Sequence, residues 1–200
     1  MGFLRLISIG FEKAFGRINF FGLVLSSLFN GTFISPFARI AFYGNISIGK
    51  NCRIASGCIF RVPKTARLVI GNNCDFREYA QVLCREGQTT EFGDNCLVQP
   101  FSFVSDNAKI GSNVILSPHS VVVAATHNFD SIETPILKQG SDTLPIEIGD
   151  NVWIGTHAII LGPSKIGSDS IIGAGTIVKG DIPEKSIVKG ERKLTIIKRR

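Results

Sequence analysis

Histidine is the side chain best suited to accept a proton near neutral pH, and this chain of 200 residues has three of them. His127 stands in the segment Ala125–Asp130, at the entrance of a twenty-residue stretch that lacks the regular pattern around it. His119 and His157 lie within that pattern, at positions whose side chains should point outward, so an ordinary surface role is expected for both. His127 is therefore the candidate general base.

Cysteine is the other reactive side chain, with five copies. Cys52, Cys58, Cys74 and Cys96 share one position of a repeat that otherwise holds small residues, whereas Cys84 falls outside it. We interpret the four as core residues that behave as small hydrophobes. Their spacings follow the repeat and form no CxxC pair, so we expect no metal site. The odd number of thiols favours a reducing compartment.

The repeat that carries these residues has a period of six. An apolar residue recurs at every sixth position, glycine often follows it directly, and the fifth position is small in most hexads. Six residues fit neither a 3.6-residue helix nor a continuous strand. They fit a short strand and a tight turn, so that three hexads close one triangular coil. Such coils begin at Ile48, Ile70, Phe92, Ile110, Ile148 and Ile166.

The coils are separated by short insertions and by one long one, the segment 128–147 directly after His127. A long loop on a rigid scaffold is where function is usually found. The sequence predicts an all-β solenoid of about six coils over residues 46–183. We expect an N-terminal helical cap over 1–45 and a basic C-terminal tail over 184–200.

The two ends allow more than one interpretation. The phenylalanine-rich start is either a cap on the first coil or a helix on a membrane surface. Its longest apolar run, Ile18–Phe29, is shorter than the roughly twenty residues needed for spanning. Charged residues interrupt the stretch where a secretory signal would need an apolar core. We therefore expect a cytoplasmic protein, with contact at the inner membrane surface as the alternative. The net charge of +6 reflects the basic tail, which either solvates the chain end or contacts phosphates.

Two eight-residue segments of the repeat resemble sequences of the hexapeptide-repeat acyltransferases: Ile148–Gly155 (IGDNVWIG) and Ile171–Val178 (IIGAGTIV). They are most similar to the galactoside, maltose and polysaccharide O-acetyltransferase branch, and the resemblance covers residues 46 to 183. It implies a left-handed parallel β-helix, a homotrimer with each active site between two subunits, and acetyl transfer from acetyl-CoA.

The resemblance also assigns roles. His127 matches the base that takes the proton from the acceptor hydroxyl, and a backbone N–H near Gly155–Thr156 matches the oxyanion donor. The matching acetyl-CoA side is formed by Trp153, Gly155, Thr156, Gly173 and Ala174.

Three features depart from the family pattern. Lys179 is displaced by one position, a closing Gly-x-Pro-Ala stretch is missing, and no asparagine matches the residue that contacts the acceptor. We assign the CoA phosphates to Lys179, Arg192 and Lys193, and the acceptor to Gln99, Ser102 and Asn128.

These residues predict an O-acetyltransferase that acts on a sugar or lipid-linked oligosaccharide in capsule, O-antigen or exopolysaccharide assembly. It would need no metal and bind no nucleic acid. An N-acetyltransferase of an amino sugar, and a serine or antibiotic acetyltransferase, remain open. A zinc carbonic anhydrase is disfavoured by the 8- and 30-residue spacings of the histidines, and a non-enzymatic scaffold would not need the histidine-bearing loop. No glycine-rich phosphate loop precedes the hexads, so we expect no nucleotidyltransferase domain.

Overall fold

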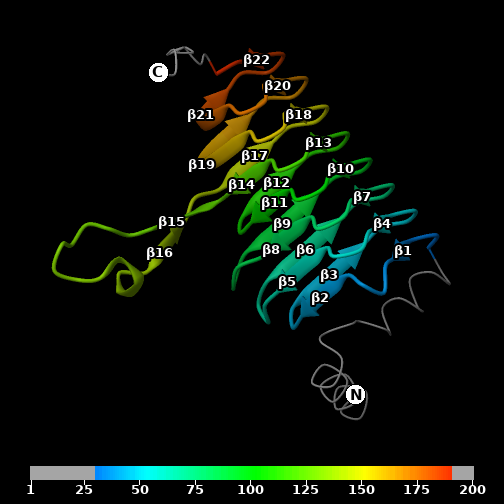
Figure 1. Cartoon of the computed structure of the whole chain (residues 1–200), viewed down its shortest axis with the longest axis horizontal. Coiled ribbons are helices and arrows are strands. Elements are labelled where there is room, and N and C mark those ends of the chain that lie inside the picture. Colours follow the sequence, from blue (N-terminus) through cyan, green and yellow to red (C-terminus); the bar gives the residue numbers. More distant parts are fainter. Residues whose placement is uncertain (1–29, 191–200) are drawn as a thin grey trace, which may run out of the picture.

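A computed structural model describes residues 30–190, which fold into a three-sided prism of short stacked strands (Figure 1). The first face is an eight-stranded parallel sheet. Its strands are β1 (Phe33–Ile34), β4 (Arg53–Ile54), β7 (Asp75–Phe76), β10 (Leu97–Val98), β13 (Ile115–Leu116), β18 (Trp153–Ile154), β20 (Ile171–Ile172) and β22 (Ile187–Val188).

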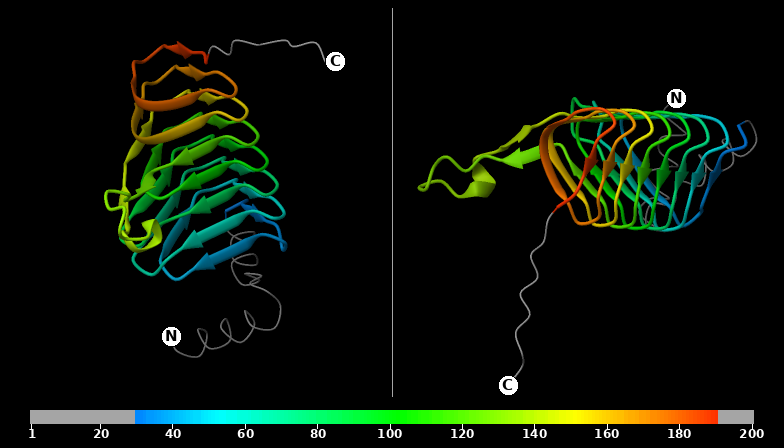
Figure 2. Two further views of the ribbon diagram at one scale, coloured as in Figure 1. Left: turned by 60° about the vertical axis from the view of Figure 1, so that its left-hand side comes forward. Right: turned by 90° about the horizontal axis from the view of Figure 1, so that it is seen from above.

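The second and third faces are two halves of one twelve-stranded sheet that bends within its longest strands. The second face holds β2 (Arg39–Phe42), β5 (Ile59–Val62), β8 (Gln81–Leu83), β11 (Phe103–Ser105), β14 (Val121–Val123) and the first halves of β19 (Ile159–Ile166) and β21 (Ile177–Ile182). The third holds β3 (Asn45–Ile48), β6 (Arg67–Ile70), β9 (Thr89–Phe92), β12 (Ala108–Ile110), β17 (Ile146–Ile148) and the second halves of β19 and β21. Figure 2 shows the triangular outline from above.

The stacking follows the hexads. The predicted coil starts lie in register on the third face, each paired with its counterpart in the next coil: Ile48, Ile70, Phe92, Ile110, Ile148 and Ile166. The parallel β-solenoid predicted from the sequence is therefore confirmed. Glycine directly after the coil start lets the coils approach, because a Cβ on Gly71 would lie 2.6 Å from the backbone carbon of Gly93.

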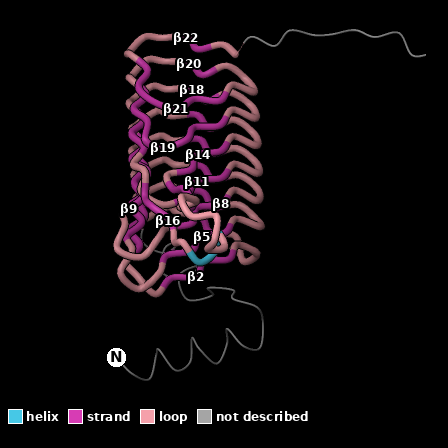
Figure 3. Tube along the Cα trace, turned by 90° about the vertical axis from the view of Figure 1, so that its left-hand side faces the viewer, coloured by secondary structure: helices cyan, strands magenta, loops and turns pink. Residues whose placement is uncertain are grey.

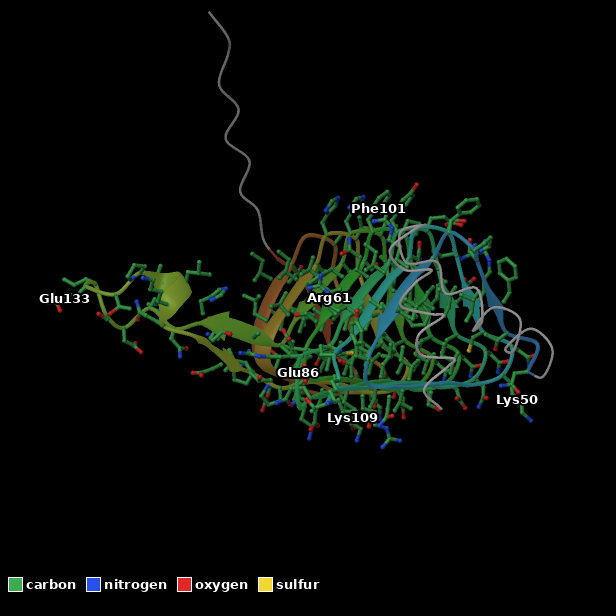
Figure 4. The ribbon with its side chains drawn as sticks, turned by 90° about the horizontal axis from the view of Figure 1, so that it is seen from below. Lys50, Arg61, Glu86, Phe101, Lys109 and Glu133 are labelled. Atoms are coloured by element: carbon green, nitrogen blue, oxygen red, sulfur yellow. The ribbon has the colours of Figure 1, made fainter. Side chains whose placement is uncertain are left out.

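The core lies along the axis of the prism and is filled by the recurring apolar residues. Part of the phenylalanine content is explained here, since Phe60, Phe76 and Phe92 form a column of edge-to-face contacts with ring centroids 5.1 Å apart. The outward side of the third face carries charged side chains instead. They include Lys165 and also Lys109, which is labelled in Figure 4. No helix within residues 30–190 is long and apolar enough to cross a membrane.

Both predicted boundaries of the solenoid were wrong. Residues 33–42, assigned to the helical cap, form β1 and β2, and residues 187–188, assigned to the tail, form β22. The solenoid thus has about seven turns. The predicted number of coils was too low because the six-residue step changes near both ends. Ile40 and Ile48 are eight positions apart, and Val178 and Ile182 are four positions apart. The rest of the predicted cap (1–29) and of the tail (191–200) lies outside the described residues.

The cysteines are free and buried, including Cys84. Burial raises the pKa of Cys58 to about 12 and also raises the pKa of Cys84. Because all five side chains are buried and out of reach, we expect a thiol reagent to label none of them quickly in the native protein and all five in denaturant. Rapid labelling of the native protein would contradict the inward orientation of these side chains.

Candidate functional site

The long insertion leaves the prism as an arm built on a short hairpin (Figures 1 and 2). Strand β15 (Ala125–His127) pairs antiparallel with β16 (Ser141–Thr143), and His127 lies opposite Ser141. The 3₁₀ turn η1 (Ile136–Lys138) lies at the far end. Pairing within the segment 128–147 was not predicted from the sequence. The root of the arm, where it joins the prism, is fixed by a 2.7 Å hydrogen bond from the Leu144 N–H to the Ala124 carbonyl oxygen.

Polar side chains hold the arm together internally. The Gln139 amide donates to the carbonyl oxygens of Ser131 (2.8 Å) and Thr134 (2.7 Å). The Asn128 amide donates to the Gln139 carbonyl oxygen (3.4 Å) and to the Asp142 carboxylate (3.5 Å). Asn128, predicted to contact the acceptor, therefore also braces the arm that carries His127.

The arm presents His127 to solvent, and its imidazole has no hydrogen-bond partner within residues 30–190. Both ring nitrogens are therefore accessible to a bound molecule. The arm leaves the prism at the corner between the second and third faces. We call this the insertion corner, because the four-residue insertions 63–66 and 85–88 lie at the same corner.

A second group of predicted residues lies on the first face and at its corner with the second face, which we call the donor corner. Trp153 is half exposed, and its indole N–H donates a 2.8 Å hydrogen bond to the hydroxyl of buried Ser117. Gln99 occupies the same row as Ser117 one coil earlier and is half-buried. The structure thus brings Gln99 and Trp153 onto one surface.

Backbone N–H groups at the donor corner distinguish the last coils from the middle ones. The third hexad position is proline in the two coils before the arm, Pro100 and Pro118, so no donor exists there. In the two coils after the arm the position is Thr156 and then Ala174, whose N–H groups donate to no protein group within residues 30–190. Two neighbouring donors are therefore available for a ligand.

The glycines of this segment have another role. The Gly155 N–H donates to the Ile172 carbonyl oxygen at 2.7 Å, and the Gly173 N–H donates to that of Val188 at 2.8 Å. These groups are occupied and cannot stabilise an oxyanion. Gly155 is required by the stacking, because a Cβ there would lie 2.6 Å from the Ala174 nitrogen. Of the two backbone N–H groups predicted as the oxyanion donor, those of Gly155 and Thr156, only the Thr156 N–H stays a candidate.

Ser102 was assigned wrongly to the acceptor. Its side chain is fully buried, and its hydroxyl donates to the Ser117 carbonyl oxygen at 3.0 Å inside the prism. It occupies the small fifth position of its hexad, which the repeat already marks as inward. Lys179 is exposed on β21, on the second face near the carboxy-terminal end. Arg192 and Lys193 lie outside the described residues.

The donor corner also carries a column of stacked rings that the sequence analysis did not predict. Tyr79, Phe101, His119 and His157 follow one another in successive coils with centroids 4.8 to 5.1 Å apart and nearly parallel planes. All four backbones have positive φ, an unfavourable conformation for bulky residues. Both histidines are exposed, as predicted, and they stack on each other, whereas His127 lies on the arm.

The two groups are separated by the second face. Figure 4 shows Phe101 at the donor corner, Glu86 beside the root of the arm, and Arg61 between them. One chain therefore does not bring His127 to Trp153, Thr156 and Ala174. The outward rows of the second face are apolar at many positions and include Phe103, Val121, Ile159 and the strongly exposed Ile177.

Comparison with known proteins supports the repeat architecture. Residues 89–124 and 145–180 match the family described as bacterial transferase hexapeptide (six repeats). A probable acetyltransferase of Mycobacterium tuberculosis is 28% identical over 74% of this chain and 48% of its own length. The galactoside O-acetyltransferase of Escherichia coli is 39% identical over 40% of this chain and 39% of its own length.

Among solved structures, the polySia-specific acetyltransferase NeuO has the same fold, with a TM-score of 0.51, 20% identity, and coverage of 81% of this chain and 74% of that one. The chain spans about half or less of the length of the two curated relatives above. The matched repeats coincide with the hexads of the prism between residues 89 and 180. The chain thus carries the hexapeptide repeats of a bacterial transferase family.

Proposed function

We propose that this protein transfers an acetyl group from acetyl-CoA to a sugar hydroxyl, with His127 as the general base. One observation carries the proposal. An exposed histidine and a pair of unpaired N–H donors beside Trp153 flank an apolar face, so two neighbouring copies would complete one site. The names of the relatives, which include a galactoside O-acetyltransferase, support the same chemistry.

The residues have distinct tasks in this reaction. His127 takes the proton from the acceptor hydroxyl as its oxygen attacks the thioester carbonyl carbon. The Thr156 N–H stabilises the negative charge that develops on the carbonyl oxygen. His127 then gives the proton to the departing sulfur as the C–S bond breaks, so the products are the acetyl ester and CoA. Ala174 and Trp153 line the pantetheine arm, and Gln99 and Asn128 contact the acceptor.

The shared site requires a homotrimer. Apolar side chains on the second face would leave water when a neighbouring prism covers them. The arm of one copy would then reach the donor corner of the next. Cyclic symmetry makes all three sites equivalent. No metal takes part in this scheme.

The acceptor we propose is a sugar or lipid-linked oligosaccharide in capsule, O-antigen or exopolysaccharide assembly, used in the cytoplasm. Lys179 would contact the CoA phosphates, together with Arg192 and Lys193. A contact of the N-terminal segment with the inner membrane surface stays a prediction.

A panel of sugars with free hydroxyl or amino groups, each incubated with acetyl-CoA, tests this function. We expect acceptor-dependent release of the CoA thiol and a product whose added mass sits on a hydroxyl oxygen. Transfer to amino sugars alone would make the protein an N-acetyltransferase. Absence of both CoA release and calorimetric binding of acetyl-CoA would overturn acetyl transfer altogether.

A further inference from the structure

We propose that Arg85 is a positioning residue that holds the arm, and with it His127, against the prism. The proposal rests on the proposed function of His127. Arg85 lies two residues after the end of β8, beyond Cys84, and begins the insertion 85–88 at the insertion corner. Its side chain is half-buried, and it reaches the arm across 56 positions of sequence.

The contact is a two-pronged hydrogen bond. The Arg85 Nη2 donates to both the carbonyl oxygen and the hydroxyl of Ser141, each at 2.7 Å. Ser141 is the residue paired with His127 across the hairpin. A guanidinium donor makes stronger hydrogen bonds than a neutral group. Arg85 therefore fixes the strand position next to the candidate base.

The support behind Arg85 is itself fixed. The Glu86 carboxylate accepts hydrogen bonds from the backbone N–H (3.1 Å) and the hydroxyl of Thr65 in the preceding coil. The Gly87 N–H donates to the same hydroxyl at 2.9 Å. Hydrogen bonds thus join the insertions 63–66 and 85–88 to each other, and Figure 4 shows Glu86 at the root of the arm.

The arm needs such a brace. Its hairpin has three pairs, and at its base the Leu144 N–H bonds to the Ala124 carbonyl oxygen. The coil between Arg85 and the arm has a short corner at Asp106–Asn107, so Arg85 extends past it to Ser141. Figure 1 shows the arm standing out from the prism, and Figure 3 views the same arm end-on. A shift of about 1 Å in a catalytic group can cost about 100-fold in rate.

The experiment compares Arg85→Ala, Arg85→Lys and Ser141→Ala with a control, Arg67→Ala, whose exposed side chain lies on the third face. We expect Arg85→Ala to lower kcat about tenfold while the KM for acetyl-CoA stays unchanged. Arg85→Lys should recover much of the loss, because an ammonium group can still donate to the Ser141 carbonyl oxygen. Ser141→Ala in the Arg85→Ala background should add little, since the partner is already lost.

A second readout does not depend on activity. Hydrogen exchange at the amides of residues 126–142 should become faster in Arg85→Ala and stay unchanged in Arg67→Ala. Unchanged exchange and unchanged kcat in Arg85→Ala would overturn the proposal. A raised KM for the acceptor at unchanged kcat would also overturn it, because Arg85 would then contact the substrate directly. Faster exchange in a protein without acetyl transfer would preserve the brace and refute the proposed function alone.

Discussion

Replacement of His127 by alanine should lower the turnover of acetyl transfer by about two to four orders of magnitude and leave the prism intact. The side chain is exposed and contacts nothing in the core, so its loss removes the base and no packing. The measurement is kcat with acetyl-CoA and the best acceptor of the panel, together with the melting temperature. The KM for acetyl-CoA should change little, because in the proposed site Trp153, Thr156 and Ala174, rather than His127, bind acetyl-CoA.

A matched control for this variant is Asp130→Asn, which alters another exposed polar residue of the same arm. It should keep kcat close to the wild-type value. Near-normal transfer by the His127→Ala protein would show that another group accepts the proton, and the role given to the arm would be wrong.

A larger side chain at the donor corner should have an effect of similar size on the KM for acetyl-CoA. In Ala174→Leu an exposed small residue gains a branched side chain beside the Thr156 and Ala174 N–H groups. We expect the KM for acetyl-CoA to rise by about two orders of magnitude, because the pantetheine arm can no longer approach these donors. The KM for the acceptor should stay near its wild-type value. Steady-state kinetics and calorimetric binding of CoA measure both.

The repeat supplies the control. Glu78 occupies the same third position of its hexad in a coil before the arm, so Glu78→Leu places a leucine on the same corner away from the proposed cofactor edge, with loss of an ion pair to Arg53 at 3.4 Å. It should leave the KM for acetyl-CoA unaltered. Equal effects of the two substitutions would point to a general disturbance of the corner rather than to a cofactor contact.

Most of the prism could be predicted from the sequence because its hexads are local and repeat. The coil starts lie in register where the hexads place them, and the inward cysteines follow from the same rule. The ends could not be predicted, because the chain changes its step at Ile40–Ile48 and Val178–Ile182. The same rule, applied consistently, would have placed Ser102 inside.

The candidate site was predictable only in part. His127 was chosen from its place at the entrance of the insertion and Trp153 from the family resemblance. The unpaired N–H of Thr156 could have been predicted from the prolines at Pro100 and Pro118. The brace formed by Arg85 and Ser141 could not, because a contact across 56 residues between two irregular segments leaves no periodic signal.

The central claim is that His127 of one chain acts with the donor corner of its neighbour, and mixing the two impaired variants tests it most directly. His127→Ala and Ala174→Leu chains, refolded together in equal amounts, form trimers of which about three quarters contain both kinds. Each mixed trimer has one site with an intact histidine and an intact donor corner. At low acetyl-CoA the mixture should therefore recover about a quarter of wild-type activity. A mixture no more active than its two parents would show that both halves of the site belong to one chain.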